Sequence, residues 1–166
     1  QEYGGQGRPH VEQMIYNEET AYFRAPTRDV TIGTELVGPT LMLFGTDEQK
    51  ARFLPEIASG AAVYCQGFSE PESGSDAASL KPSARREGDA FIVNGTKMFI
   101  TNSEMGTTFS VFVRTHPYAS LRHKGISCLI IEKGMPGFTV GRHLHKLGYK
   151  GIRSGELIFQ DCRVPA

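Results

Sequence analysis

Tryptophan is absent from the 166-residue sequence, and cysteine occurs only three times, as Cys65, Cys128 and Cys162. The cysteines lie far apart and include no Cys-x-x-Cys pair, which argues against a disulfide framework and against a zinc knuckle. A catalytic thiol would need a partner base, and no spacing marks one. We therefore expect all three to be small buried apolar residues in a protein of a reducing compartment.

Net charge and long apolar runs are also lacking. The 18 lysines and arginines balance 18 aspartates and glutamates, so neither nucleic acid nor an anionic membrane is expected as the main partner. No apolar run reaches membrane-spanning length, and we expect no membrane insertion. The sequence begins with glutamine and shows no leader pattern, so we expect part of a longer protein or a processed product.

Several common ligand motifs are missing. There is no Gly-x-Gly-x-x-Gly that follows a strand, no Walker loop and no Gly-x-Ser-x-Gly elbow, which argues against a Rossmann-type cofactor site. His143 and His145 alternate on one expected strand face, but no cysteine or acidic residue is placed as a third ligand. We therefore expect no metal site. His10, His116 and His123 are isolated and are expected at the surface.

The first sixty residues carry apolar side chains at helical spacing. Helices are predicted at 9–22, at about 29–44 and from Thr46 to about Ser59. Two glycines and Pro39 should bend or interrupt the second helix. Thr46 followed by Gln49 is a capping-box pattern, and Pro55 is expected to split the third helix into two short pieces.

After Gly60 the pattern changes to alternation and short apolar runs, which favours strands. The expected strands lie near 61–68, 91–94, 97–101, 109–114, 126–132, 137–141 and 155–160. Asn94-Gly95 lies between two β-rich runs, and this pair predicts a hairpin turn. Helices that precede the strands, instead of alternating with them, indicate an α+β protein whose strands form a sandwich or a barrel.

Residues 64–76, with the sequence YCQGFSEPESGSD, are the most informative stretch. An apolar run gives way abruptly to small polar residues, and Gly74 permits a close backbone approach. Ser69, Ser73 and Ser75 add short donors and acceptors, so such a loop can hold a polar heterocycle or an anion with main-chain groups. The alternative is an ordinary surface turn, which composition alone favours.

A second candidate segment begins at Phe99. Phe99 and Thr101 are two residues apart, so the aromatic ring and the hydroxyl point to the same face of a strand. One could lie against a flat ring while the other bonds its edge. The alternative is a half-buried strand end, because aromatic residues and threonine are favoured in strands.

Five glutamates are general bases by residue type alone, and no spacing marks any of them. They are Glu70, Glu72, Glu104, Glu132 and Glu156. Structural or solvated roles are favoured for all five. Glu70 could be held by the N–H groups of its own loop, which would lower its basicity.

Five blocks of the sequence resemble acyl-CoA dehydrogenases: EYGGQG, FGTDEQKARFLPEIASG, SEPESGSD, KMFITNS and KLGYKGIRSGELIFQDCRVPA. They follow the family's order and cover nearly the whole chain. The resemblance implies that residues 1–60 end an N-terminal helical domain. Residues 61–166 would form a middle, antiparallel β-barrel domain that binds flavin and acyl-CoA. The family's C-terminal helical bundle is missing from this sequence.

The resemblance also implies which residues surround the cofactor, FAD. They are Gln66, Gly67, Phe68, Ser69, Gly74, Ser75, Phe99, Ile100 and Thr101. Ser69 would contact the polar edge of the isoalloxazine, Phe99 would cover the ring, and Thr101 would bond near its N5. Ser75 would also contact the acyl-CoA substrate. The catalytic base, a glutamate of the bundle, has no match here, so it is expected beyond Ala166 and the 166 residues alone are expected to be inactive.

The implied reaction is the α,β-dehydrogenation of an acyl-CoA thioester in fatty acid metabolism, with hydride transfer to flavin N5. A homo-oligomer, dimer or tetramer, would pass electrons to an electron-transfer flavoprotein or a similar acceptor, in the cytoplasm or in the mitochondrial matrix. Two positions depart from the family: Glu72 replaces a glycine and Phe99 replaces the common tryptophan. An acyl-CoA or nitroalkane oxidase and a non-catalytic acyl-CoA-binding or scaffold relative are the alternatives.

Overall fold

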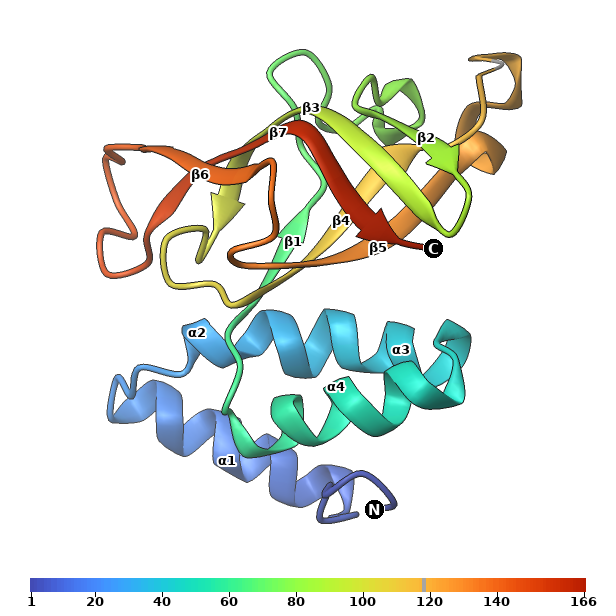
Figure 1. Cartoon of the computed structure of the whole chain (residues 1–166). Coiled ribbons are helices and arrows are strands. Elements are labelled where there is room, and N and C mark those ends of the chain that lie inside the picture. Colours follow the sequence, from blue (N-terminus) through green and yellow to red (C-terminus); the bar gives the residue numbers. More distant parts are fainter. Residues whose placement is uncertain (118) are drawn as a thin grey trace. The chain divides into compact units, whose positions relative to one another are not determined.

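The structure, a computed structural model, describes residues 1–117 and 119–166. The chain divides into two compact units, Gln1–Val63 and Tyr64–Ala166. The first unit is helical and the second consists mainly of strands, as the colours of Figure 1 show along the sequence. The predicted α+β class, with helices before strands, is therefore confirmed.

The helical unit contains α1 (His10–Tyr22), α2 (Arg28–Thr31), the π-helical turn η1 (Ile32–Val37), α3 (Gly38–Phe44) and α4 (Asp47–Ser59). Elements α2, η1 and α3 follow one another without a loop, so the predicted interruption takes the form of a widened π turn. Gly38 donates its N–H to the carbonyl of Gly33, five residues earlier. Pro39, which has no N–H to donate, follows directly, and a π turn before it accommodates the missing bond.

Helix α4 confirms the predicted capping box. The Thr46 hydroxyl accepts from the Gln49 amide, and the Gln49 side chain accepts from the Thr46 amide. The prediction that Pro55 splits this helix is wrong, since α4 continues through it to Ser59. Phe53, Leu54 and Ile57 are buried on both sides of the proline. Their burial, about 1.5–3 kcal/mol each, outweighs the roughly 3 kcal/mol cost of an internal proline.

In the described part of the second unit there are seven strands and two short 3-10 helices. The strands are β1 (Tyr64–Gly67), β2 (Ser83–Glu87), β3 (Ala90–Thr101), β4 (Thr108–Arg114), β5 (Ile126–Glu132), β6 (Phe138–His143) and β7 (Ser154–Pro165). The 3-10 helices are η2 (Ala77–Ser79) and η3 (Ala119–Gly125). One sheet has the order β1-β4-β2-β3-β7-β6, with β5 also paired to β4, and it curls into a half-barrel (Figure 1).

The sheet is mixed, not wholly antiparallel as expected. Strand β4 pairs in parallel with β1 and, at one position, with β2. The remaining pairs are antiparallel. The difference arises because the β2–β3 hairpin lies between β1 and β4 in the sequence, so the chain returns to β1 in the same direction.

The hairpin predicted at Asn94-Gly95 is wrong. Strand β3 runs straight through this pair, and its register with β7 shifts between Val93 and Gly95, which marks a β-bulge. The Asn94 side chain pairs across the strands with Asp161: its Nδ2 donates to Asp161 Oδ1 over 3.0 Å, and its Oδ1 accepts from the Asp161 amide over 2.9 Å. The actual hairpin joins β2 to β3 at Gly88, where φ is +61°.

The core of the β-rich unit is formed by the inward residues of the curled sheet. Among them are Val93, Phe109, Val111, Ile131, Leu157 and Phe159. Cys65 and Cys162 belong to this core, whereas Cys128 is exposed, so the expected burial of all three cysteines is wrong for Cys128. The side chain of Cys128, on β5, points away from the core. Among the described residues, no helix has both the length and the apolar character needed to cross a bilayer.

Candidate functional site

The first candidate segment leaves the sheet where β1 ends. Gly67 pairs with Val111 in the parallel β1–β4 ladder, and Phe68 follows it. The Phe68 ring stacks on Phe112 of β4, with the ring centroids 4.1 Å apart. Gln66 is half-buried and Gly67 is buried. One face of the half-buried Phe68 ring is thus covered by Phe112.

A main-chain hydrogen bond joins the two candidate segments. The Met98 amide of β3 donates to the carbonyl oxygen of Ser69 over 2.8 Å. The loop that begins at Ser69 therefore lies beside β3 one residue before Phe99. Both Ser69 and Thr101 are half-buried, and neither hydroxyl has a hydrogen-bond partner within the described part of the chain.

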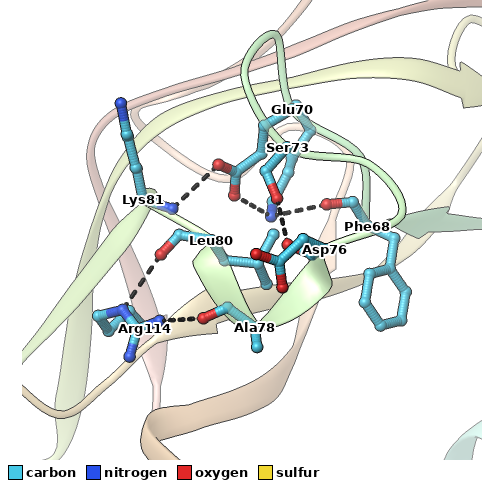
Figure 2. Close-up of polar contacts among 9 residues, drawn as sticks. Phe68, Glu70, Ser73, Asp76, Ala78, Leu80, Lys81 and Arg114 are labelled. Atoms are coloured by element: carbon cyan, nitrogen blue, oxygen red, sulfur yellow. Dashed lines mark hydrogen bonds and ion pairs between the residues drawn. The ribbon is translucent and has the colours of Figure 1, made fainter. Parts of the chain in front are cut away.

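A buried ion pair lies directly behind this contact. Lys97 Nζ donates to Glu70 Oε1 over 2.9 Å and to the carbonyl oxygen of Phe68 over 3.0 Å. The side chains of Lys97 and Glu70 are only 0% and 3% exposed. The second carboxylate oxygen of Glu70 accepts from the Lys81 amide over 2.9 Å. Figure 2 shows the Glu70 carboxylate directed toward the Lys81 amide. Both carboxylate oxygens are thus occupied by donors of the chain itself.

The partners of Glu70 correct one expectation. The donors to its carboxylate come from β3 and from the Lys81 amide, 11 residues along the chain, and not from N–H groups next to it in its own loop. The sequence did not predict a role for Lys97, because its only signal is a lone charge within an apolar β-rich run. Burial lowers the pKa of Lys97, while the hydrogen bond and the charge of Glu70 partly oppose that shift.

The rest of the loop is tied to its own backbone and to β4. Ser73 is buried, and its hydroxyl donates to the Asp76 carbonyl over 2.7 Å. Arg114 donates to the carbonyls of Ala78 over 2.8 Å and Leu80 over 3.1 Å (Figure 2). The two bonds from Arg114 hold the backbone just before β2 in place, because hydrogen bonds from a charged guanidinium are strong.

Two residues of this loop remain without such ties. Ser75 is exposed. A Cβ atom built on Gly74 would meet no described atom within 4 Å, so the expected close approach is not to another part of this chain.

Phe99 has a backbone conformation that is rare for an aromatic residue. Its φ is +61°, and its side chain is 65% exposed. The register of β3 with β7 shifts between Lys97 and Ile100, so Phe99 occupies a second bulge. Ile100 is buried, which leaves the Phe99 ring outside the core. A left-handed backbone conformation costs a residue with a side chain about 1–2 kcal/mol. Strained conformations of this kind cluster at functional sites.

Glu72, the charge that departs from the expected family pattern, forms an ion pair with Lys81. Both side chains are mostly exposed, so the carboxylate is directed to solvent and its charge is partly neutralised. Glu104 pairs with Arg153 and Glu156 with Arg142. These contacts agree with the structural or solvated roles favoured for the glutamates.

The two histidines considered for metal binding lie close together. The rings of His143 and His145 meet edge to face, with centroids 5.6 Å apart, but β6 ends at His143, so they do not share a strand face. Outside residue 118, histidine, cysteine and acidic side chains form no group of three or more that would suit a metal ion.

Comparisons with known proteins follow the same division of the chain. The family described as "Acyl-CoA dehydrogenase, N-terminal domain" matches residues 1–61, and "Acyl-CoA dehydrogenase, middle domain" matches residues 65–162. Acyl-CoA dehydrogenase FadE26 of Mycobacterium tuberculosis is 40% identical over 166 residues, which cover 99% of this chain and 40% of that protein. The chain thus spans about two fifths of the length of this relative.

Solved structures agree with the sequence comparison. The crystal structure of an acyl-CoA dehydrogenase from Geobacillus kaustophilus superposes with a TM-score of 0.91 at 37% identity, over 99% of this chain and 43% of that chain. A glutaryl-CoA dehydrogenase from Mycobacterium smegmatis in complex with FADH2 gives a TM-score of 0.74 at 34% identity, over 84% of this chain and 34% of that one. The chain belongs to the acyl-CoA dehydrogenase family.

Proposed function

We propose that residues 61–166 form the flavin- and acyl-CoA-binding domain of an FAD-dependent acyl-CoA dehydrogenase, and that residues 1–60 end its N-terminal helical domain. The hydrogen bond from the Met98 amide to the Ser69 carbonyl carries this proposal. It brings together two segments, one with the Ser69 hydroxyl and one with the Phe99 ring. A planar ring with a polar edge is the kind of ligand that this combination suits.

The residues present fit such a ring. The face of the exposed Phe99 ring is available for stacking, and the strain in its backbone is maintained although the residue is 65% exposed. The half-buried hydroxyls of Ser69 and Thr101 can each donate and accept. The open space at Gly74 is explained by a ligand that approaches the main chain there.

The proposed cofactor contacts are Gln66, Gly67, Phe68, Ser69, Gly74, Ser75, Phe99, Ile100 and Thr101. Because its ring stacks on Phe112, Phe68 would contribute main-chain groups. Phe99 would cover one face of the ring system, although with less area than a tryptophan. Ser75, which is exposed, would contact both FAD and acyl-CoA.

FAD, when bound, supplies the acceptor for a hydride from the β-carbon of the acyl thioester. The chain's own residues orient it, and the Thr101 hydroxyl would donate toward the edge where negative charge develops. Glu70 cannot act as the base, because it is buried and paired with Lys97. We place the base beyond Ala166, so no catalytic residue is assigned within these 166 residues.

The partners belong to the same proposal. The substrate is an acyl-CoA, and an electron-transfer flavoprotein or a similar acceptor reoxidises the flavin. The whole protein forms a dimer or a tetramer in the cytoplasm or the mitochondrial matrix. Oxygen uptake during turnover tests the acceptor, because an oxidase consumes oxygen and a dehydrogenase needs the second protein.

The test uses the full-length protein that contains this chain. It should purify yellow, and anaerobic addition of acyl-CoA thioesters should bleach the flavin absorbance. A colourless protein that takes up no FAD would contradict the proposal. A yellow protein that no acyl-CoA bleaches would favour the non-catalytic relative instead.

The position of the base is tested separately in the same protein. Glu104→Gln, Glu132→Gln and Glu156→Gln should each retain the rate of flavin reduction. A loss of several orders of magnitude in one variant, with FAD still bound, would place the base inside this chain.

A further inference from the structure

The buried Lys97–Glu70 pair is the one buried charge pair of the β-rich unit among the described residues. It satisfies several groups at once, because Lys97 donates to two acceptors and Glu70 accepts from two donors. No buried side-chain nitrogen or oxygen of the described residues lacks a partner. Each charged atom of the pair therefore has at least one partner within the described chain.

A gain in folding stability does not by itself explain why a buried charge pair is present at this position. Removing two charges from water is costly, and apolar residues of similar volume often give equal or greater stability. Burial accordingly lowers the pKa of Lys97 even though Glu70 opposes the shift. The location of the pair gives a more specific reason for its presence.

The bonds of the pair hold the chain on both sides of Ser69. On one side, Lys97 binds the Phe68 carbonyl, and on the other side it binds the Glu70 carboxylate. The Ser69 carbonyl itself accepts from Met98. Three successive loop residues are thus fixed to two successive residues of β3, while the Ser69 hydroxyl keeps no partner in the described chain.

We propose that Lys97 and Glu70 are positioning residues that set the Phe68–Ser69 main chain and the Ser69 hydroxyl in place for the flavin. This inference rests on the proposed function, and it assigns to the pair an effect on flavin geometry beyond any effect on folding. A lysine suits the task because its ammonium group can donate to a carbonyl and a carboxylate at the same time. A methionine of similar length keeps the volume and loses both bonds.

The experiment compares Lys97→Met, Glu70→Gln and the double variant in the full-length protein. FAD affinity, the visible absorption and circular dichroism of bound flavin, and thermal stability are measured for each. Glu72→Gln is the matched control, because it makes the same change two residues away in an exposed ion pair. The control should match the wild type in all three measurements.

Each single variant leaves one buried group without its charged partner, so both stability and FAD affinity should fall. The double variant leaves no unpaired charge, and its thermal stability should recover toward that of the wild type. Its FAD dissociation constant should nevertheless stay about tenfold higher, with an altered flavin spectrum, because the bond to the Phe68 carbonyl is still missing.

A double variant with wild-type affinity and spectrum would overturn the inference and leave the pair a purely structural role. The same result would leave the proposed function intact, since the wild type would still bind FAD. Failure of the proposed function shows earlier, as a wild-type protein that binds no FAD at all. The two failures are therefore separable within one set of measurements.

Discussion

The backbone amide of Met98 donates a hydrogen bond to the carbonyl oxygen of Ser69 over 2.8 Å. This contact places a loop serine beside a strand that carries an aromatic residue in a left-handed conformation. Neither residue needs its side chain for the bond, so the contact leaves the Ser69 hydroxyl free for other partners. Variants of the residues around this contact allow the site to be tested in parts.

Phe99→Gly and Phe99→Ala should separate backbone strain from ring stacking. Glycine adopts a φ of +61° without strain, so Phe99→Gly should be about 1 kcal/mol more stable than Phe99→Ala. Both variants lose the ring and should bind FAD more weakly by a similar factor. Chemical denaturation and flavin titration measure the two effects. Equal stabilities would argue against strain at this position.

The bulge at Gly95 predicts a large difference between two glycine substitutions. The φ of Gly95 is +132°, and an added Cβ would lie 2.8 Å from the Pro82 Cβ. At Gly88, φ is +61° and an added Cβ would meet no described atom within 4 Å. Gly95→Ala should therefore be at least about 1 kcal/mol less stable than Gly88→Ala, as urea denaturation would show. The reverse order would contradict the bulge.

The lowered pKa of Lys97 predicts a specific pH dependence of stability. The unfolded chain restores the ordinary value of 10.5, so between the two pKa values the unfolded state binds more protons than the folded state. The free energy of unfolding due to Lys97 should therefore rise with pH in that window and stay constant below it. Wild type and Lys97→Met are compared by denaturant unfolding from neutral pH to pH 10.5. A difference that falls as pH rises would refute the assignment.

Thiol labelling should distinguish the cysteines. Burial raises the pKa of Cys65 to about 12, so at about pH 8 only about one molecule in ten thousand holds its thiolate. Cys162 is also buried. Nearby protein atoms raise the pKa of Cys128 as well, to about 11, but its side chain is exposed, so a reagent can reach it. In the native protein a maleimide should modify Cys128 first, and a Cys128→Ser variant should lose this fast phase. After denaturation all three should react, as mass spectrometry of the labelled peptides would record.

Local sequence patterns predicted the elements that depend on local forces. The capping box of Thr46 and Gln49 is satisfied within one turn, and β5 begins and ends where alternation placed it, at Ile126 and Glu132. Such features need no distant partner. The order of helices and strands likewise follows from the change in hydrophobic period after Gly60.

The features that the sequence did not predict depend on residues far apart in the chain. Asn94-Gly95 has the propensity of a tight turn, but Asp161, 67 residues away, engages the Asn94 side chain and keeps the strand extended. The Lys97–Glu70 pair spans 27 residues and leaves no local pattern. The candidate site was found largely through family resemblance, because the composition of its loop alone favours an ordinary surface turn.

The parallel ladder between β1 and β4 has a consequence for biosynthesis. Tyr64–Gly67 finds its ladder partner only in Thr108–Val111, a segment made later in the chain. During translation β1 therefore leaves the ribosome before its parallel partner β4 has been made, and β1 must wait unpaired. Pairing of segments so far apart is slow compared with hairpin closure. The loop that follows β1 should thus stay open to proteases until Thr108–Val111 has been made and has paired with β1.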